Sequence, residues 1–234
     1  MINREKTCII VSLLRKEAIC MPKYKSLSIL GDSISTYEGF SNDKSANSTT
    51  YLNKVFYRSQ FPPELTYWMR IMNDLGLSLC VNNSQSGGNL SGRDDETSGI
   101  NRAGQLMRDD GAMPDLIILF MGLNDMGRNL PIERFSADYL ETLKILKQNY
   151  KSAKVCCVNI PDRDPYLKAR ATLFNQAIKT AVETMGEDFF IADLFNSRLN
   201  NDFYYDNTID GLHPDQDGMR LIAEVVEEAI KCNI

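Results

Sequence analysis

Five short, largely apolar runs recur along the chain. Runs of this kind, in which successive residues are apolar without alternation, are typical of strands that are buried on both faces. The pattern therefore predicts five strands, at Leu27–Leu30, Leu77–Val81, Leu116–Met121, Val155–Ile160 and Phe189–Leu194.

Segments with helical periodicity separate these runs. Apolar residues recur every three or four positions between Pro62 and Gly76, from Ser136 onward, over Lys168–Met185 and from Gln216 to Lys231. Strands that alternate with helices and are buried on both faces indicate a parallel sheet covered on both sides. Right-handed crossovers then predict a three-layer α/β/α sandwich of flavodoxin-like type with a parallel five-stranded sheet.

The length of 234 residues suits one domain, which we expect over residues 22–234. Residues 1–21 are expected to be an N-terminal extension, either not native or poorly ordered, because Met21 is a second candidate start. The apolar stretch from Cys8 to Leu14 is only about as long as the shortest signal-peptide core, and Arg15 interrupts it. We therefore expect a cytoplasmic protein.

Composition narrows the class of protein. Apolar residues make up 43% and charged residues 24%, as in ordinary soluble proteins, and no run is long enough to span a membrane. A net charge of −5 argues against a nucleic-acid partner. The six cysteines form no C-x-x-C pair, so buried free thiols are favoured over disulfides or a zinc site. The sequence shows no additional row of apolar residues that would indicate an interface between subunits, so it does not determine the oligomeric state.

Residues able to do chemistry follow the predicted strands. Gly31-Asp32-Ser33 ends the first run and brings Ser33 to the C-terminal edge of the sheet, where α/β proteins bind ligands. The segments 82–88 and 122–125 follow the second and third runs and contain glycine and asparagine. Each segment, taken alone, is equally well explained as an ordinary turn.

His213 is the single histidine of the chain. Any mechanism that needs a histidine base must use it, and a histidine-rich metal site is excluded. Asp210 precedes it by three residues in a loop bounded by Gly211 and Pro214. On such a turn the Asp210 carboxylate can bind the Nδ1–H group of the imidazole and leave Nε2 to accept a proton.

Together the four segments resemble the sequence blocks of the SGNH, or GDSL-type, hydrolases, in the expected order. The matching residues span nearly all of the chain after Met21. One residue departs from the family pattern: Ile34 occupies the position of the leucine in the Gly-Asp-Ser-Leu motif. The matching residues are Gly31-Asp32-Ser33, the glycine at Gly87, Gly122-Leu123-Asn124-Asp125 and Asp210-x-x-His213.

The resemblance implies a catalytic triad of Ser33, His213 and Asp210, with no metal and no organic cofactor. It also implies an oxyanion hole formed by the backbone N–H groups of Ser33 and Gly87 and the side-chain amide of Asn124. Gly88 could supply the backbone N–H group in place of Gly87. We favour Gly87, because it directly follows Ser86. We assign Asp32 and Asp125 to structure, as acceptors for nearby backbone N–H groups.

The expected function is a serine esterase that hydrolyses carboxylic esters through an acyl-enzyme. No long apolar lid is visible, which favours short acyl groups, with acetyl on a carbohydrate as one candidate. The expected partner is thus a small-molecule or glycan ester. Two alternatives stay open: a non-catalytic flavin- or nucleotide-binding module, and a metal-dependent phosphoesterase that uses Asp32 and Asp125.

Two connections are longer than a strand–helix unit needs, at residues 34–61 and 88–114. The first contains six aromatic residues. They could line a pocket or pin the loop to the domain, and we favour pinning because aromatic side chains are heavily used in packing. The six are Tyr37, Phe40, Tyr51, Phe56, Tyr57 and Phe61.

Overall fold

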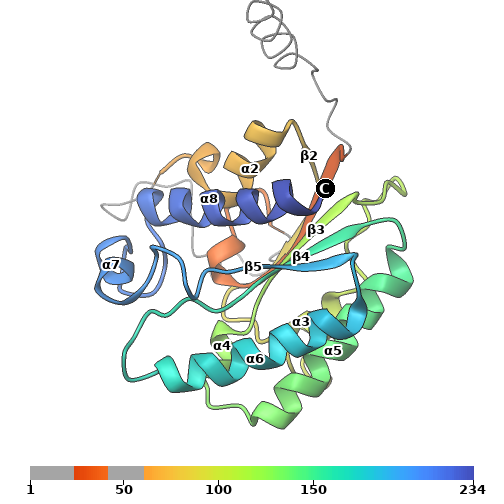
Figure 1. Cartoon of the computed structure of the whole chain (residues 1–234). Coiled ribbons are helices and arrows are strands. Elements are labelled where there is room, and N and C mark those ends of the chain that lie inside the picture. The colour runs from red at the N-terminus through yellow and green to blue at the C-terminus, as the bar shows by residue number, and fades with distance from the viewer. Residues whose placement is uncertain (1–23, 42–60) are drawn as a thin grey trace, which may run out of the picture.

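A five-stranded parallel sheet forms the centre of the molecule (Figure 1). The structure, a computed structural model, describes residues 24–41 and 61–234, so the expected N-terminal extension lies outside the described residues. The strands lie in the order β2-β1-β3-β4-β5, which is the predicted flavodoxin-like order. They are β1 (Ser26–Gly31), β2 (Ser78–Ser84), β3 (Leu116–Phe120), β4 (Lys154–Val158) and β5 (Phe189–Ala192).

Helices cover both faces of the sheet, which confirms the predicted three-layer sandwich. Helices α2 (Tyr67–Leu75) and α8 (Gln216–Asn233) pack together on one face, and α5 (Ile132–Asn149) and α6 (Lys168–Met185) pack on the other (Figure 1). Short helices occupy the connections. They are the 3₁₀ turns η1 (Ser33–Ser35) and η2 (Pro63–Leu65) and the helices α3 (Gly99–Arg102), α4 (Leu123–Gly127) and α7 (Asn201–Asp206).

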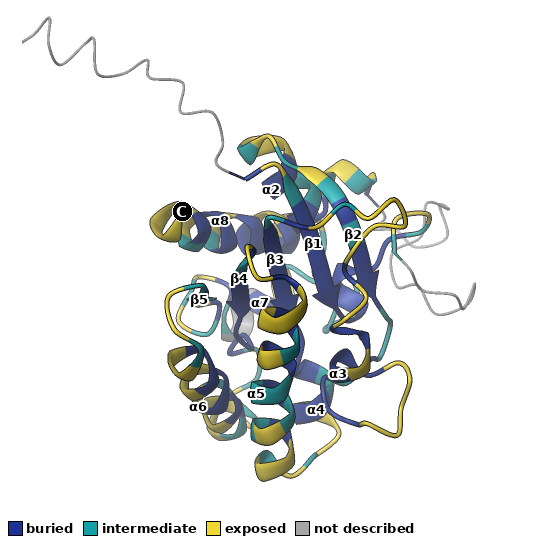
Figure 2. Cartoon of the chain, turned by 90° about the vertical axis from the view of Figure 1, so that its right-hand side faces the viewer, coloured by how far each residue is buried: buried dark blue, intermediate teal, exposed yellow. Residues whose placement is uncertain are grey.

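Four strands, β1, β3, β4 and β5, are buried along most of their length and form the core, whereas the edge strand β2 starts at an exposed residue (Figure 2). All of β3 is buried, as continuous apolar runs require in a covered parallel sheet. Ser28 is a polar residue inside this core. Its hydroxyl group donates to the Leu106 carbonyl at 2.8 Å and accepts from the Val81 N–H at 3.2 Å, where the β1–β2 register shifts. The hydroxyl group thus satisfies backbone groups that the irregular pairing leaves open.

Several element boundaries differ from the prediction by one or more residues, and two of the differences have a clear cause. Strand β2 runs on to Ser84, because the polar residues at its end are buried by hydrogen bonds rather than by apolar packing. Helix α5 begins at Ile132 rather than Ser136, with Pro131 before its first residue. The extra turn places Phe135 in the core, fully buried, beside the face that the periodicity predicted.

The aromatic connection is pinned to the domain at both described ends. Tyr37 is 1% exposed, and its hydroxyl group donates to the Phe61 carbonyl at 2.9 Å. Phe40 stacks on Trp68 with ring centroids 5.8 Å apart. The packing interpretation therefore holds for these residues, whereas Tyr51, Phe56 and Tyr57 lie outside the described residues.

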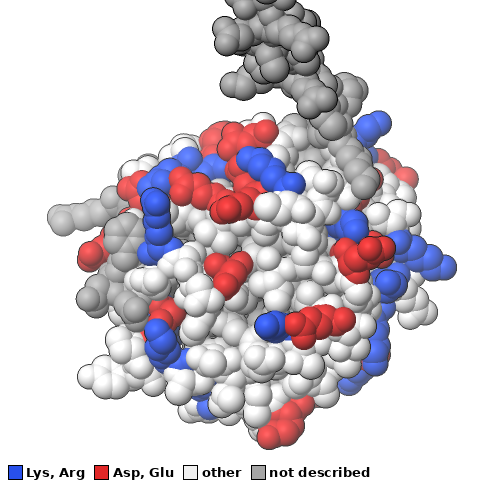
Figure 3. Space-filling model, viewed as in Figure 1, with Lys and Arg blue, Asp and Glu red and all other residues white. Residues whose placement is uncertain are grey.

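The described surface carries both signs of charge. On the face drawn in Figure 3, acidic and basic side chains are interspersed and neither sign forms one continuous patch. Cys80, Cys156 and Cys157 are free and buried, as predicted, whereas Cys232 is free and exposed. Among the residues that the structure describes, no helix combines the length and apolar character needed to cross a membrane.

Candidate active site

Ser33 lies in a tight turn directly after β1. Asp32 caps η1, because its carboxylate accepts the Ile34 N–H group at 3.0 Å. Gly31 is required for this turn: a Cβ atom there would lie 2.6 Å from Cβ of Ser35 and 2.7 Å from Oγ of Ser84. Ser33 itself is 7% exposed, so it is largely enclosed at the edge of the sheet.

His213 reaches Ser33 from the other end of the chain. Its Nε2 atom lies 2.9 Å from Oγ of Ser33, and its Nδ1 atom lies 2.7 Å from Oδ2 of Asp210. The other carboxylate oxygen of Asp210 accepts the backbone N–H groups of Leu212 and His213 at 3.0 and 2.8 Å. The structure therefore brings all three predicted triad residues together.

The protonation pattern of this chain of contacts follows from Asp210. Burial alone would raise the pKa of Asp210, but hydrogen bonds from the backbone and ring of His213 outweigh it and lower that pKa. An ionised carboxylate can only accept, so the proton of a neutral imidazole stays on Nδ1. Nε2 of His213 is then the acceptor that faces the hydroxyl group of Ser33.

The histidine loop is held by α7 and α8. The Tyr204 hydroxyl group donates to the Leu212 carbonyl at 2.7 Å, and the Ile209 N–H group donates to the His213 carbonyl at 2.8 Å. Helix α8 crosses directly beneath, where a Cβ atom on Gly218 would lie 2.9 Å from Cβ of Pro214. The close contact between Gly218 and Pro214 therefore fixes the position of the histidine loop relative to α8.

Asn124 lies beside Ser33 but its amide group already has acceptors. Nδ2 donates to the Gly88 carbonyl at 3.1 Å and to Oδ2 of Asp32 at 3.4 Å. Asp32 is fully buried, and this burial raises its pKa to about 7 although the Ile34 N–H and Arg102 oppose the shift. The amide can serve a substrate oxygen only by giving up one of its two bonds, and the bond to Asp32 is the longer.

Gly87 lies in the turn after β2, next to this group. Its carbonyl accepts Nη1 of Arg128 at 2.7 Å, and it is not one of the residues that line the hollow at Ser33. Within the described residues, the backbone N–H groups of Ser33 and Gly87 donate to no acceptor. Unpaired backbone N–H groups are candidate hydrogen-bond donors to a bound oxygen atom.

Asp125 is structural, as the sequence predicted. It is fully buried, and its two carboxylate oxygens accept the backbone N–H groups of Leu90 and Ser91 at 2.7 and 2.9 Å. Burial raises its pKa, and these two hydrogen bonds oppose the increase. Across residues 24–41 and 61–234, no group of three or more metal-ligating side chains is found.

A hollow of about 130 Å³ opens at Ser33. Two arginines that the sequence analysis missed line it, Arg128 and Arg163. Arg128 lies one helical turn after Asn124, a spacing that could have revealed it. No sequence signal marked Arg163. The hollow is lined by Ser33, Leu123, Asn124, Gly127, Arg128, Arg163 and Leu212.

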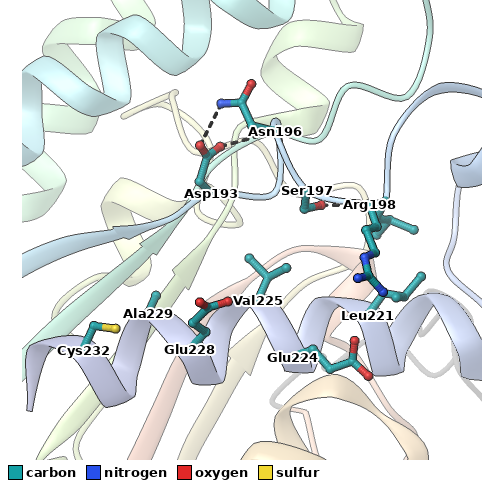
Figure 4. Close-up of a pocket in the computed structure, with 11 residues that line it drawn as sticks. Asp193, Asn196, Ser197, Arg198, Leu221, Glu224, Val225, Glu228, Ala229 and Cys232 are labelled. Atoms are coloured by element: carbon teal, nitrogen blue, oxygen red, sulfur yellow. Dashed lines mark hydrogen bonds between the residues drawn. The ribbon is translucent and has the colours of Figure 1, made fainter.

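A larger hollow of about 610 Å³ lies between α8 and the segment after β5 (Figure 4). Leu221, Val225 and Ala229 form its apolar side on the helix, and Arg198 reaches in from the facing segment. It shares no lining residue with the hollow at Ser33, and the triad does not open into it.

Comparison with solved structures identifies the same fold in several esterases. A protein named as a GDSL-like lipase from Bacteroides ovatus has 22% identity and a TM-score of 0.71, covering 89% of this chain and 98% of that one. A similarly named Bacteroides uniformis protein has 23% identity, a TM-score of 0.67 and coverages of 89% and 96%. A carbohydrate esterase family 2 enzyme from Corynascus thermopiles has 20% identity, a TM-score of 0.61 and coverages of 89% and 66%.

Two sequence comparisons, with curated proteins and with family models, gave different results. Among curated proteins, none matches this chain. The model of the family described as GDSL-like Lipase/Acylhydrolase matches residues 27–226, which include every residue of the triad. The chain therefore belongs to the GDSL-like lipase/acylhydrolase family and is an ester hydrolase.

Proposed function

We propose that this ester hydrolase is a serine esterase that cleaves short acyl esters through an acyl-enzyme intermediate. One observation carries the proposal: the 2.9 Å contact between Nε2 of His213 and Oγ of Ser33, continued by the 2.7 Å contact between Nδ1 and Asp210. A hydroxyl group, an imidazole and a carboxylate in this order form the arrangement that activates a serine nucleophile.

In the first half of the reaction, Oγ of Ser33 attacks the ester carbonyl carbon while Nε2 of His213 takes the hydroxyl proton. The Asp210 carboxylate stabilises the imidazolium that forms. As the tetrahedral intermediate collapses, the C–O bond to the alcohol breaks and His213 returns the proton to the leaving oxygen. Water then attacks the acyl-enzyme with His213 again as base, and the acid and free Ser33 are released.

Three groups are proposed to stabilise the oxyanion: the backbone N–H groups of Ser33 and Gly87 and the side-chain amide of Asn124. The two N–H groups have no other acceptor among the described residues, which supports this role. Asn124 would exchange its 3.4 Å contact with Asp32 for the oxyanion and keep its bond to the Gly88 carbonyl. Donors held in place in this way lower the barrier without reorganisation.

The proposed acyl group is short, with acetyl on a carbohydrate as the leading case. The hollow at Ser33 measures about 130 Å³. A water molecule has a share of about 30 Å³ in the liquid, so the hollow has room for an acetyl group. The fold shared with a carbohydrate esterase family 2 enzyme supports a sugar as the alcohol. A series of 4-nitrophenyl esters from acetate to laurate should show falling kcat/KM with chain length.

Fluorophosphonate labelling with peptide mapping tests the mechanism. We expect one modified residue, Ser33, with the modification lost in Ser33→Ala and strongly slowed in His213→Ala. Ser197→Ala is the matched control, because Ser197 lies at the other hollow and should leave labelling unchanged. Absence of labelling together with activity that EDTA abolishes would favour the metal-dependent phosphoesterase instead. Absence of labelling with tight nucleotide or flavin binding would favour the binding module.

We also propose that the protein works in the cytoplasm. The free thiols at Cys80, Cys156, Cys157 and Cys232 support a reducing compartment. Fractionation of the natural host, followed by detection of the protein with a specific antibody, tests this; recovery in the culture medium or periplasm would contradict it.

A further inference from the structure

The hollow at Ser33 has an unusual lining for an ester site. Two of its seven lining residues are arginines, Arg128 and Arg163, and none is acidic. The chain as a whole carries a net charge of −5, so this positive charge is a local feature. Positive charge concentrated in a small hollow attracts anionic groups of a ligand.

Arg163 has the fewest contacts. The residue is half-buried, and its Nε atom is enclosed by protein without a hydrogen-bond partner among the described residues. Its two acidic neighbours in sequence are engaged elsewhere: Asp162 forms an ion pair with Lys168 at 2.7 Å, and Asp164 accepts the Tyr166 N–H group. A buried N–H group without an acceptor is costly, and an anion that binds it removes the cost.

Arg128 is exposed and only partly engaged. Its Nη1 atom donates to the Gly87 carbonyl at 2.7 Å and to Oδ1 of Asn89 at 2.6 Å, both neutral acceptors. The charge of Arg128 also contributes to a lowered pKa at Asp95, although hydrogen bonds from Thr97 are the larger cause. Its charge is therefore not neutralised by direct contact with a carboxylate of the described chain.

Four other arginines of the described chain are paired with acidic side chains. Arg93, Arg108, Arg134 and Arg220 each lie within ion-pair distance of a carboxylate. Two nearby carboxylates are engaged in other hydrogen bonds: Asp210 with His213, and the buried Asp32 with the turn of η1. Neither of them lines the hollow.

We propose that the natural substrate carries an anionic oxygen group, a carboxylate or a phosphate, that binds Arg163 while the ester carbonyl lies at Ser33. Arg128 adds positive charge to the same hollow. The guanidinium fork matches the two oxygens of such groups and forms charge-assisted hydrogen bonds with them. This inference rests on the proposed esterase function and specifies its substrate class: esters of acidic sugars or sugar phosphates rather than of neutral glycans.

Three acetyl esters on one sugar ring test the inference: acetylated methyl glucoside, acetylated methyl glucuronide and acetylated glucose 6-phosphate. We expect kcat/KM for the glucuronide or the phosphate to exceed that for the glucoside about tenfold or more, the preferred one identifying the anion. The preference should shrink between about 0.02 and 0.5 M NaCl, since salt screens the attraction. Equal kcat/KM values for all three esters would overturn the inference and leave the esterase function intact.

Arg163→Gln, with Arg198→Gln as a charge-matched control at the other hollow, assigns the preference to its residue. We expect the anionic-to-neutral ratio of kcat/KM to fall about tenfold in Arg163→Gln, mainly through KM, and to stay unchanged in Arg198→Gln. Arg163→Lys should restore part of the ratio, because it restores the charge. A ratio that survives in Arg163→Gln, or equal losses on all three esters, would overturn the inference. Wild-type protein inactive on every ester would refute the proposed function instead.

Discussion

The two halves of the triad are supported in opposite ways. Ser33 follows the central strand β1, is 7% exposed and lies in a turn where a Cβ atom at Gly31 would crowd Ser35 and Ser84. His213 lies in a loop beyond the sheet, where its partner Asp210 has a half-exposed side chain. The nucleophile is positioned by the core of the fold, and the base by a handful of local hydrogen bonds. Substitutions in the two halves should therefore separate activity from stability.

The largest effect is expected from Ser33→Ala. Nucleophile and base act as one unit, so kcat for a short ester should fall about 10⁶-fold. The hydroxyl group contributes only one hydrogen bond, so urea unfolding should shift by about 1 kcal/mol or less. A variant that keeps more than about a hundredth of wild-type kcat in purified form would show that Ser33 is not the nucleophile.

Asp210→Asn should be milder, with kcat lower by about 10⁴-fold, because asparagine no longer fixes the proton on Nδ1. Asp210 lies in an exposed loop, so the free energy of unfolding should change little. Steady-state kinetics and urea unfolding, measured on the same preparation, check both parts. A large loss of stability would contradict the view that the base half is only locally supported.

Asn124→Ala should lower kcat by about 10²–10³-fold, or roughly 3–4 kcal/mol, if its amide serves the oxyanion. Asn149→Ala, on the exposed side of α5, is the control and should leave kcat unchanged. Single-turnover acylation with 4-nitrophenyl acetate isolates the step. An unchanged acylation rate would leave Asn124 with a structural role only, bound to Gly88 and Asp32.

Asp32→Asn should change how stability depends on pH. Burial raises the pKa of Asp32 in the folded protein to about 7, far above the ordinary value of 3.8. Folded protein therefore holds a proton that the unfolded chain has lost, and wild-type stability falls as pH rises from about 4 to 7. Asparagine removes this loss, so the variant should gain relative stability over that window, by roughly 4 kcal/mol at most. If the free energies of unfolding of wild type and Asp32→Asn changed with pH in the same way, the result would contradict a raised pKa of Asp32.

The smallest effect is expected from Gly31→Ala, which tests the core-supported half directly. The added methyl group would meet Ser35 and Ser84, and such overpacking typically costs about 1–3 kcal/mol. Gly104→Ala is the matched control, because nothing lies within 4 Å of a Cβ atom there. Urea unfolding should show the loss only in Gly31→Ala, with reduced kcat because the turn carrying Ser33 moves. Equal stability of both variants would mean that the turn tolerates more than its geometry suggests.

Sequence patterns predicted what apolar burial controls. The sheet, its layers and the order of its strands follow from continuous apolar runs separated by amphipathic helices. The end of β2 was missed because Asn82 and Asn83 are buried by hydrogen bonds, to Ser35 and Gln105, and no hydropathy pattern marks such burial. The same limit applies to Ser28.

The site divides in the same way. The contact between Asp210 and His213 was predictable because the two residues are neighbours on one turn and the chain has a single histidine. The position of Arg163 in the hollow was not predictable, because it depends on the course of the backbone after β4 and no sequence motif marks it. The double engagement of the Asn124 amide was likewise invisible, because it joins segments 92 and 36 residues apart.

The contact between Ser33 and His213 joins residues 180 positions apart, and α8 follows the histidine loop at once. The proposed nucleophile and its proposed base therefore meet only after almost the whole chain has left the ribosome, and we expect chains that lack the histidine loop to be inactive. Long-range closure of this kind is a late event in folding. The return of ester hydrolysis during refolding should therefore indicate that the whole domain has folded.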